Sequence, residues 1–382
     1  MSDPVAAAAR LAPRFAARAA AHDAAGTFPE ADFADLRDAG LFGLLVPAAA
    51  GGAGAGFATY VEVAHALARG SGATALVYNM HASVTGALAA VTDELAADLG
   101  VGDAALAARD AALAAAAAGR WYAVAMSERV AGSRLSRLDT AYVRDGDGYR
   151  ITGRKSFCSG AGHADAYLVA ARAGDAVSQF LVPADTPGLT VVPTWDALGM
   201  RATCSHDLAV DVRVPAAALL GGVEGLALAV AALMPHWMVA SYAAVYVGVA
   251  RAAVDAAVAH VRERGTAELP AVRARIGRAD AAVAAARQVV QEAARRVDAA
   301  PDDPATRAWV WRAKLLSGDT AAEVAASMLA AAGTAATRRG NPLERLYRDA
   351  RCGALQPPPS DVCADWLGAA ALGADPDAGQ RW

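Results

Sequence analysis

The chain has 382 residues, of which 55% are hydrophobic and 19% are charged, and its formal net charge is −4. This length allows two or three domains, each with a sizeable hydrophobic core. The 35 basic residues do not exceed the 39 acidic ones, so there is no basic surplus to neutralise phosphates, and we exclude nucleic acid as the main partner.

The cysteine pattern and the N-terminus indicate where the protein works. Cys158, Cys204, Cys352 and Cys363 form no C-x-x-C pair and have no histidine at zinc spacing. We therefore expect free thiols in a reducing compartment and no metal site. The first residues carry no basic stretch ahead of an apolar core, so we expect no secretory signal and a cytoplasmic protein.

The first third of the chain reads as helical. Its apolar residues recur at spacings of three and four, which is typical of helices that bury one face. The glycine-rich stretch 51–54 interrupts this pattern and predicts a turn-rich connection. We expect an N-terminal helical domain over residues 1–120, with helices at about 6–21, 28–39, 57–69 and 73–91.

The middle of the chain changes to short apolar runs separated by turn residues, which is typical of half-buried strands. We expect strands at 167–170, 180–182 and 208–214. Asp145-Gly146-Asp147-Gly148 predicts a hairpin turn between two strands. The sequence thus predicts a β domain over residues 121–220, in the form of a sandwich or barrel.

The remaining residues, 221–382, return to helical spacing and predict an antiparallel four-helix bundle. The expected helices cover 225–263, 268–299, 304–332 and 341–351. Residues 225–250 contain no charged side chain and exceed the roughly 20 residues that span a bilayer. Because Pro235 interrupts this run and small residues dominate it, we expect a buried helix and no membrane span. The fold class is therefore mainly α with a β insert.

Five short motifs occur in an order that resembles the acyl-CoA dehydrogenase superfamily of flavoproteins, and the resemblance covers nearly the whole chain. Each motif alone is weak, but their common order is specific. They are Val46-Pro47 with Gly51-Gly52-Ala53-Gly54, Met126–Arg134, Ile151–Gly160, Gly199–Thr203 with Val214-Pro215, and Leu343–Ala350.

The resemblance implies a flavin, either FAD or FMN, and assigns residues to it. A reduced isoalloxazine ring needs backbone and hydroxyl donors around its pyrimidine edge, a role that suits Ser127 and Ser159. Ser133 is expected at the pyrophosphate and Phe157 against the ring face. The adenosine half has few candidate donors. The full set of expected cofactor-binding residues is Met126, Ser127, Gly132, Ser133, Phe157, Ser159, Arg264 and Gly333.

The sequence departs from the family at the catalytic base. The family's Y-E-G-T segment falls on Gln356-Pro357-Pro358-Pro359, and an alternative base position falls on Met238. Neither position carries a carboxylate. His236 and His81 are the remaining candidate acid/base groups. A packing or hydrogen-bonded core histidine is the alternative reading of each, and His206 and His163 are expected to have local or surface roles.

Three functions remain open from the sequence. The first is a flavin-dependent oxidoreductase of acyl-CoA dehydrogenase type, acting on an acyl thioester or related small molecule without the family's glutamate. The second is a two-component monooxygenase or N-hydroxylase that uses reduced flavin and O2. The third is a non-catalytic partner subunit of an active homologue. A carrier protein or a flavin reductase is a possible partner, and the resemblance implies a homodimer or homotetramer.

Overall fold

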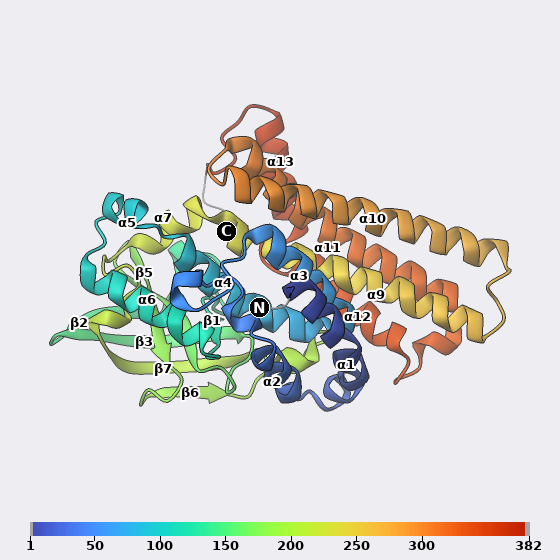
Figure 1. Ribbon diagram of the computed structural model, residues 1–382, viewed down its shortest axis with the longest axis horizontal. Helices are drawn as coiled ribbons and strands as arrows, with labels where there is room; N and C mark the ends of the chain where they lie inside the picture. Colours follow the sequence, from blue (N-terminus) through green and yellow to red (C-terminus); the bar gives the residue numbers. More distant parts are fainter. Residues whose placement is uncertain (1–2, 379–382) are drawn as a thin grey trace.

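The computed structural model describes residues 3–378, and Figure 1 shows the sheet at one end of the molecule, with shorter helices packed over it and the long C-terminal helices extending away from it. Helix α1 begins where the Asp3 side chain accepts a hydrogen bond from Val5 N at 2.9 Å, and it ends at Gly26 in the left-handed conformation. The N-terminal helices are α1 Pro4–Ala25, α2 Glu30–Asp38, α3 Phe57–Gly70, α4 Gly72–Ala90, α5 Asp93–Asp98 and α6 Asp103–Ala117.

Seven strands form the sheet that the sequence predicted. Its order is β1-β4-β2-β3-β7-β6, and β5 pairs with β4. Asp145 lies opposite Gly148 in the β2–β3 pair, which confirms the predicted hairpin turn. The strands are β1 Tyr122–Ala125, β2 Ala141–Asp145, β3 Gly148–Cys158, β4 Ala166–Ala173, β5 Ala176–Pro183, β6 Leu189–Val192 and β7 His206–Pro215.

The C-terminal helices are α7 Leu226–Leu233, α8 Pro235–Met238, α9 Ser241–Glu263, α10 Pro270–Ala299, α11 Pro304–Ala332, α12 Pro342–Leu355 and α13 Ser360–Ala371. The prediction of one helix over 225–263 is wrong, because the chain breaks twice there. Met234 leaves the helical region at φ −124° and ψ 52°, since the ring of Pro235 disfavours a helical residue before it. Short 3₁₀ turns occur at Leu41–Gly43, Ala48–Ala50, Leu135–Arg137, Arg201–Thr203, Ala216–Ala218 and Thr334–Thr337.

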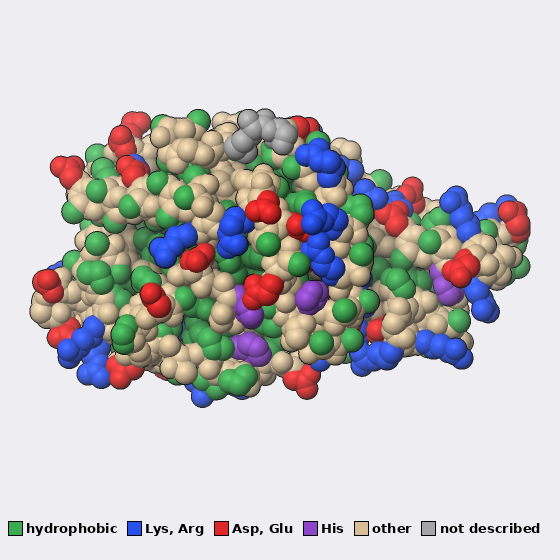
Figure 2. Space-filling model, turned by 60° about the horizontal axis from the view of Figure 1, so that its bottom comes forward, with side chains coloured by type: hydrophobic (Ala, Val, Ile, Leu, Met, Phe, Trp, Pro, Cys, Tyr) green, Lys and Arg blue, Asp and Glu red, His purple; other side chains and the backbone are tan. Residues whose placement is uncertain are grey.

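The α8–α9 segment, Pro235–Glu263, is long and apolar enough to cross a bilayer, but 67% of its most apolar window is buried inside the protein. It packs against α3, α11 and α12 and is therefore a core helix of the bundle. Figure 2 shows acidic and basic side chains intermixed over one face of the molecule. The predicted fold class is confirmed. The chain forms a helical N-terminal domain, a central β domain and a helical C-terminal domain.

Candidate functional site

A cavity of about 560 Å3 lies where the sheet meets the helices of both halves of the chain. Its volume falls within the range of about 300–1,000 Å3 that is typical of ligand pockets. Hydroxyl and backbone groups of the loops around β1, β3 and β7 form one wall. Apolar and aromatic side chains of α4, α7, α8 and α9 form the other.

Six of the eight residues expected to hold the cofactor line this cavity: Met126, Ser127, Gly132, Ser133, Phe157 and Ser159. The loop that carries the first four closes on itself, because Glu128 and Gly132 exchange backbone hydrogen bonds of 2.9 and 2.8 Å. Gly132 has a φ of 62°, a conformation that glycine adopts without strain. Ser156 N donates to Ser127 O at 2.9 Å, so the loop is fixed against β3.

Phe157 stands in the cavity because the strand that carries it is irregular. The pairing of β3 with β7 shifts register between Lys155 and Cys158, and Phe157 has a φ of 55°. The ring is 65% exposed and meets Trp195 edge-on, with the ring centroids 5.9 Å apart. A bulge that turns a large aromatic side chain into a pocket, at a cost in backbone strain, is typical of a functional position.

A buried ion pair supports the same wall from behind. Lys155 Nζ lies 2.8 Å from Glu128 Oε1, and both side chains are almost fully buried. The other Glu128 oxygen accepts from Asp139 N at 2.6 Å. Burial alone would raise the pKa of Glu128, but the bonds from Lys155 and Thr140 outweigh it and the pKa is lowered. Burial lowers the pKa of Lys155 against the opposing effect of Glu128.

Three hydroxyl groups form a chain along the sheet side of the cavity. Ser159 Oγ lies 2.9 Å from Ser205 Oγ, and Ser205 Oγ lies 2.7 Å from Thr203 Oγ1. Thr203 Oγ1 donates to Met200 O at 2.9 Å. Sequence reasoning identified Ser159 but missed Ser205 and Thr203. The signal that could have found them is the pair of hydroxyl residues that follows Gly199-Met200-Arg201.

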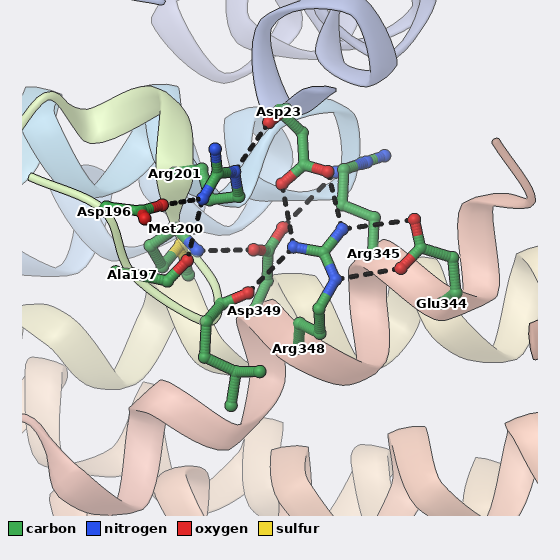
Figure 3. A network of polar contacts seen from close by, with 10 residues as sticks. Asp23, Asp196, Ala197, Met200, Arg201, Glu344, Arg345, Arg348 and Asp349 are labelled. Carbon is green, nitrogen blue, oxygen red and sulfur yellow. Dashed lines mark hydrogen bonds and ion pairs between the residues drawn. The ribbon is translucent and has the colours of Figure 1, made fainter. Parts of the chain in front are cut away.

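A charged network anchors the loop that carries this chain to α12 (Figure 3). Asp349 Oδ1 accepts from Met200 N at 2.6 Å. Arg348 forms two hydrogen bonds to Asp23 of α1 and two to Glu344, and it donates to Leu198 O at 2.9 Å. The hydrogen bonds to Asp23 raise the pKa of Arg348 above its ordinary value. The network joins α1, α12 and the loop before β7 at one point.

The part of the helical side that α4, α7, α8 and α9 form is apolar, whereas the end of α12 adds Arg351 and, just after it, Gln356. Among the described residues that line it from α4, α7, α8 and α9, none carries a charge; they are Leu76, Met80, Ser83, Ala87, Val230, Ala231, Met234, Trp237, Met238, Tyr242 and Tyr246. Trp237 can occupy this position because residue 86 is a glycine. A Cβ atom at Gly86 would lie 2.1 Å from the indole ring. Burial raises the pKa of Tyr242 to about 12.

The positions at which the family carries its base border the cavity, but no carboxylate occupies them. Gln356, Pro357 and Met238 all line the cavity, and Gln356 Oε1 accepts from Tyr246 OH at 2.5 Å. Glu128 is the sole acidic residue among the described lining residues, and both its oxygens are occupied as described above. No unpaired carboxylate therefore faces the cavity from the described part of the chain.

The two candidate catalytic histidines lie outside the cavity lining. His81 Nε2 donates to Phe42 O at 2.8 Å, and its Nδ1 accepts from Tyr122 N at 3.1 Å, so both ring nitrogens are engaged. His236 packs edge-on against Phe57 at 5.2 Å between ring centroids. Burial lowers the pKa of each imidazole to about 4. Their positions do not support the expected catalytic roles, and both rings are placed as neutral packing groups.

Arg264 and Gly333 also lie away from the cavity. They follow the last residues of α9 and α11, and Figure 1 shows both helices extending away from the sheet. Arg264 is 18 residues beyond Tyr246 of α9, which corresponds to about 27 Å along a helix. In one copy of the chain these two residues are not brought together with the other six.

Comparisons with known proteins agree with this geometry. Residues 5–99, 123–212 and 240–355 match the N-terminal, middle and C-terminal domains of acyl-CoA dehydrogenases. The chain is 31% identical to the putative acyl-CoA dehydrogenase YdbM of Bacillus subtilis, over 95% of each chain. It is 33% identical to L-evernosamine nitrososynthase of a Micromonospora species, over 97% of this chain and 90% of that one. The structure of FMN-bound TdsC from Paenibacillus sp. A11-2 has a TM-score of 0.84 and 25% identity over 97% of each chain.

Proposed function

Because this chain belongs to the acyl-CoA dehydrogenase superfamily of flavin-dependent oxidoreductases, we propose that it uses reduced flavin and O2 to oxygenate a neutral, largely apolar small molecule. One observation carries the proposal: among the residues that the structure describes, no unpaired carboxylate lines the cavity. Dehydrogenation of an acyl thioester requires a base that removes the α-proton, whereas oxygenation by reduced flavin does not. One oxygen atom enters the substrate, and the other leaves as water with the two electrons that the flavin supplies.

The sheet side of the cavity fits a flavin ring. Ser127 and Ser159 offer polar groups to its pyrimidine edge, and the exposed ring of Phe157 offers an aromatic face. The helical side fits the substrate. Trp237, Met238 and their neighbours exclude water from the reaction, which lengthens the life of any reactive oxygen species formed there.

The substrate's apolar part is expected in an adjoining pocket of about 80 Å3. This pocket shares Ala87, Leu168, Gln179 and Val230 with the main cavity, so the two spaces lie side by side. Its other lining residues are mostly aliphatic, apart from Arg109, Ser178 and Gly221, and come from α4, α6, β5, α7, the loop after α5 and the segment before α7. An apolar ligand gains free energy by leaving water for such a surface. The favoured substrate is therefore apolar and uncharged at the reacting end.

FMN is the proposed flavin, supplied in reduced form by a separate reductase. Its ring and phosphate can be held by the six residues that line the cavity of one chain, whereas Arg264 and Gly333 could meet an adenosine group only from a second copy. The solved structure of TdsC is an FMN-bound form. We also propose that copies associate as a dimer or tetramer through the C-terminal helices.

A dehydrogenase of acyl thioesters remains the second candidate, since YdbM is named as a putative acyl-CoA dehydrogenase. Two experiments separate the candidates. The purified protein is mixed with FMN, NADH, a flavin reductase and either indole or dibenzothiophene, and the oxygenated product is followed by mass spectrometry. In parallel, the flavin-loaded protein is titrated anaerobically with butyryl-CoA.

We expect oxygenated product that depends on the reductase, and no bleaching of bound flavin by butyryl-CoA. A Trp237→Ala variant serves as the control, because it should bind FMN with unchanged affinity and yet release more hydrogen peroxide per oxygenation as water enters. Anaerobic bleaching of the bound flavin by butyryl-CoA, without any reductase, would instead support dehydrogenation of an acyl thioester as the function.

A further inference from the structure

Two buried arginines of α12 differ in how far their charge is compensated. Arg348 is 7% exposed and forms five hydrogen bonds, four of them to carboxylates. Arg345 is 9% exposed, but its single contact among the residues that the structure describes joins its Nη1 to Asp349 Oδ2 at 3.5 Å. A buried cation without an adequate partner is costly, so Arg345 needs a further anion.

Asp349 is a weak partner for this cation. Its Oδ1 already accepts from Met200 N at 2.6 Å, and its Oδ2 lies at the limit of hydrogen-bonding distance from Arg345. Burial raises the pKa of Asp349, and the charge of Arg345 opposes that rise only in part. The charge of Arg345 therefore stays largely uncompensated within the described chain.

The donors that Arg345 leaves free have a defined geometry. A guanidinium group has five N–H donors, and Asp349 meets Nη1 alone. Nε is buried without a hydrogen-bond partner. Together Nε and Nη2 form an edge that can hold both oxygens of one carboxylate. The same edge of Arg150 binds Asp211 in this chain, with distances of 3.0 and 3.2 Å.

Arg345 lines a separate pocket of about 380 Å3 between α1, α3, α9 and α12. None of the described residues that line this pocket also lines the main cavity. Asp255, at the pocket as well, is already paired with Arg69 at 3.0 Å and with Arg251 at 2.9 Å. The remaining lining residues are mostly small and apolar, namely Ala9, Ala12, Pro13, Ala16, Ala66, Gly70, Ala252, Ala256, Pro342 and Leu346.

The lining of the pocket indicates which kind of anion fits. Its volume lies within the range of small-molecule sites, about 300–1,000 Å3, so an inorganic ion would leave most of it to water. An aliphatic group gains free energy by leaving water for the alanine-rich wall. The planar edge of the Arg345 guanidinium matches a planar carboxylate.

We propose that this pocket is a second ligand site, which binds a small aliphatic carboxylate. The carboxylate lies on Nε and Nη2 of Arg345, and the aliphatic part lies against the alanines of α1 and α9. The site adjoins the network of Figure 3, because Arg345 also contacts Asp349.

The binding test uses hexanoate as the probe and isothermal titration calorimetry as the readout. The full chain without flavin, near pH 7, is titrated with hexanoate, hexanamide and inorganic phosphate. We expect saturable binding of hexanoate. Hexanamide lacks the charge and phosphate lacks the chain, so each should bind about tenfold more weakly or not at all. Equal affinity for hexanamide or for phosphate would overturn the proposal.

Two pairs of variants assign the binding to this pocket. Arg345→Met removes the cation and should weaken hexanoate binding by about tenfold or more, whereas Arg345→Lys keeps the charge and should lose less. Ala256→Leu fills the pocket and should also weaken binding. Ala259→Leu makes the same change at an exposed position of α9 outside the pocket and should bind hexanoate as wild type does. The alanine pair serves if Arg345→Met does not fold.

Unchanged hexanoate affinity in Arg345→Met or in Ala256→Leu would overturn the proposal, because hexanoate would then bind elsewhere. Absence of binding to the wild type would overturn it as well. A changed oligomeric state of Arg345→Met, measured by light scattering, would then identify a carboxylate of a second copy as the partner of Arg345. These measurements use no flavin, reductase or O2, so failure of the proposed function and failure of this inference can be told apart.

Discussion

Backbone strain in this protein is concentrated around the cavity. Among the described non-glycine residues, those with positive φ are Phe157, Met200 and Cys204, at 55°, 52° and 44°. The first two line the cavity, and Cys204 lies between Thr203 and Ser205, which also line it. Each such residue costs on the order of 1–3 kcal/mol and persists where the surrounding structure enforces it. The strain at these positions lowers the stability of the protein, and the same backbone conformations orient side chains and backbone groups at the cavity.

Phe157 allows the cost and the benefit of this strain to be measured separately. Phe157→Gly and Phe157→Ala both remove the ring, but only glycine tolerates the left-handed backbone. We expect the glycine variant to be more stable than the alanine variant by about 1 kcal/mol, measured by urea unfolding without flavin. Both variants should bind FMN at least tenfold more weakly, as measured by fluorescence quenching. Equal stability of the two variants would show that the backbone relaxes once the ring is gone.

The Lys155–Glu128 pair should dominate the local response to pH. Lys155→Met leaves Glu128 buried without its cation and is expected to lower the free energy of unfolding by about 3–5 kcal/mol at pH 7. The folded-state pKa of Glu128 is lowered. Its contribution to stability is therefore present above its ordinary pKa of 4.5 and is lost as the pH falls through the lower folded value.

The difference between wild type and Lys155→Met should therefore shrink below pH 4.5, because a protonated Glu128 needs no cation. Urea unfolding at pH 3.5, 5 and 7 measures it. The double variant Lys155→Met with Glu128→Leu is the control, and it should recover much of the lost stability. A difference that stays constant with pH would show that lost packing, not the charge, caused the effect.

At the scale of elements, hydrophobic periodicity was sufficient to predict most helices and strands, but it did not reveal the break at Met234. The uncharged residues 225–250 look continuous in sequence because apolar residues occur on every side. The structure divides them into α7, α8 and α9. The expected register placed His236 near the missing base. The break instead directs that ring toward Phe57 and leaves Trp237 and Met238 to face the cavity.

The site residues likewise include some that the sequence could predict and some contacts that it could not. Ser127 and Ser159 were predictable because they follow motifs with fixed local spacing. The Ser159–Ser205 and Tyr246–Gln356 contacts were not predictable, because the two partners lie 46 and 110 residues apart in the sequence. Local sequence specifies a loop, but it does not specify which loop from another element will meet it. Both contacts therefore required coordinates.

The loop between β6 and β7 is expected to depend on α12 for its order. Asp349→Ala removes the acceptor of Met200 N, which is buried, and should lower the free energy of unfolding by about 1–3 kcal/mol. Asp349→Asn keeps an oxygen for that N–H and should cost less. Hydrogen exchange at residues 199–205 should accelerate more in the alanine variant. Equal exchange in both variants would mean that Arg348 alone holds the loop, through Leu198 O.

At the scale of the whole molecule, the long helices separate two parts of the predicted cofactor site. The cavity lies at the sheet end, and Arg264 and Gly333 follow the far ends of α9 and α11. A flavin bound within one chain meets only the first part. FAD could use both parts if a second copy presented its helix ends, whereas FMN has no adenosine group to reach them. The choice of flavin is therefore linked to how copies of the chain associate.

This separation gives a direct test with Arg264→Ala. The side chain lies about 27 Å along the helix axis from Tyr246, so its removal should leave the dissociation constant of FMN within about twofold of wild type. Phe157→Ala is the matched control that weakens FMN by removing a group in the cavity itself. If Arg264→Ala weakens FAD while FMN is unaffected, a second copy supplies the adenosine contact, because Arg264 follows the end of α9 that lies far from the cavity of its own chain. A tenfold loss of FMN affinity in Arg264→Ala would contradict the single-chain FMN site. Arg264 would then have to contact the flavin from a neighbouring copy of the chain.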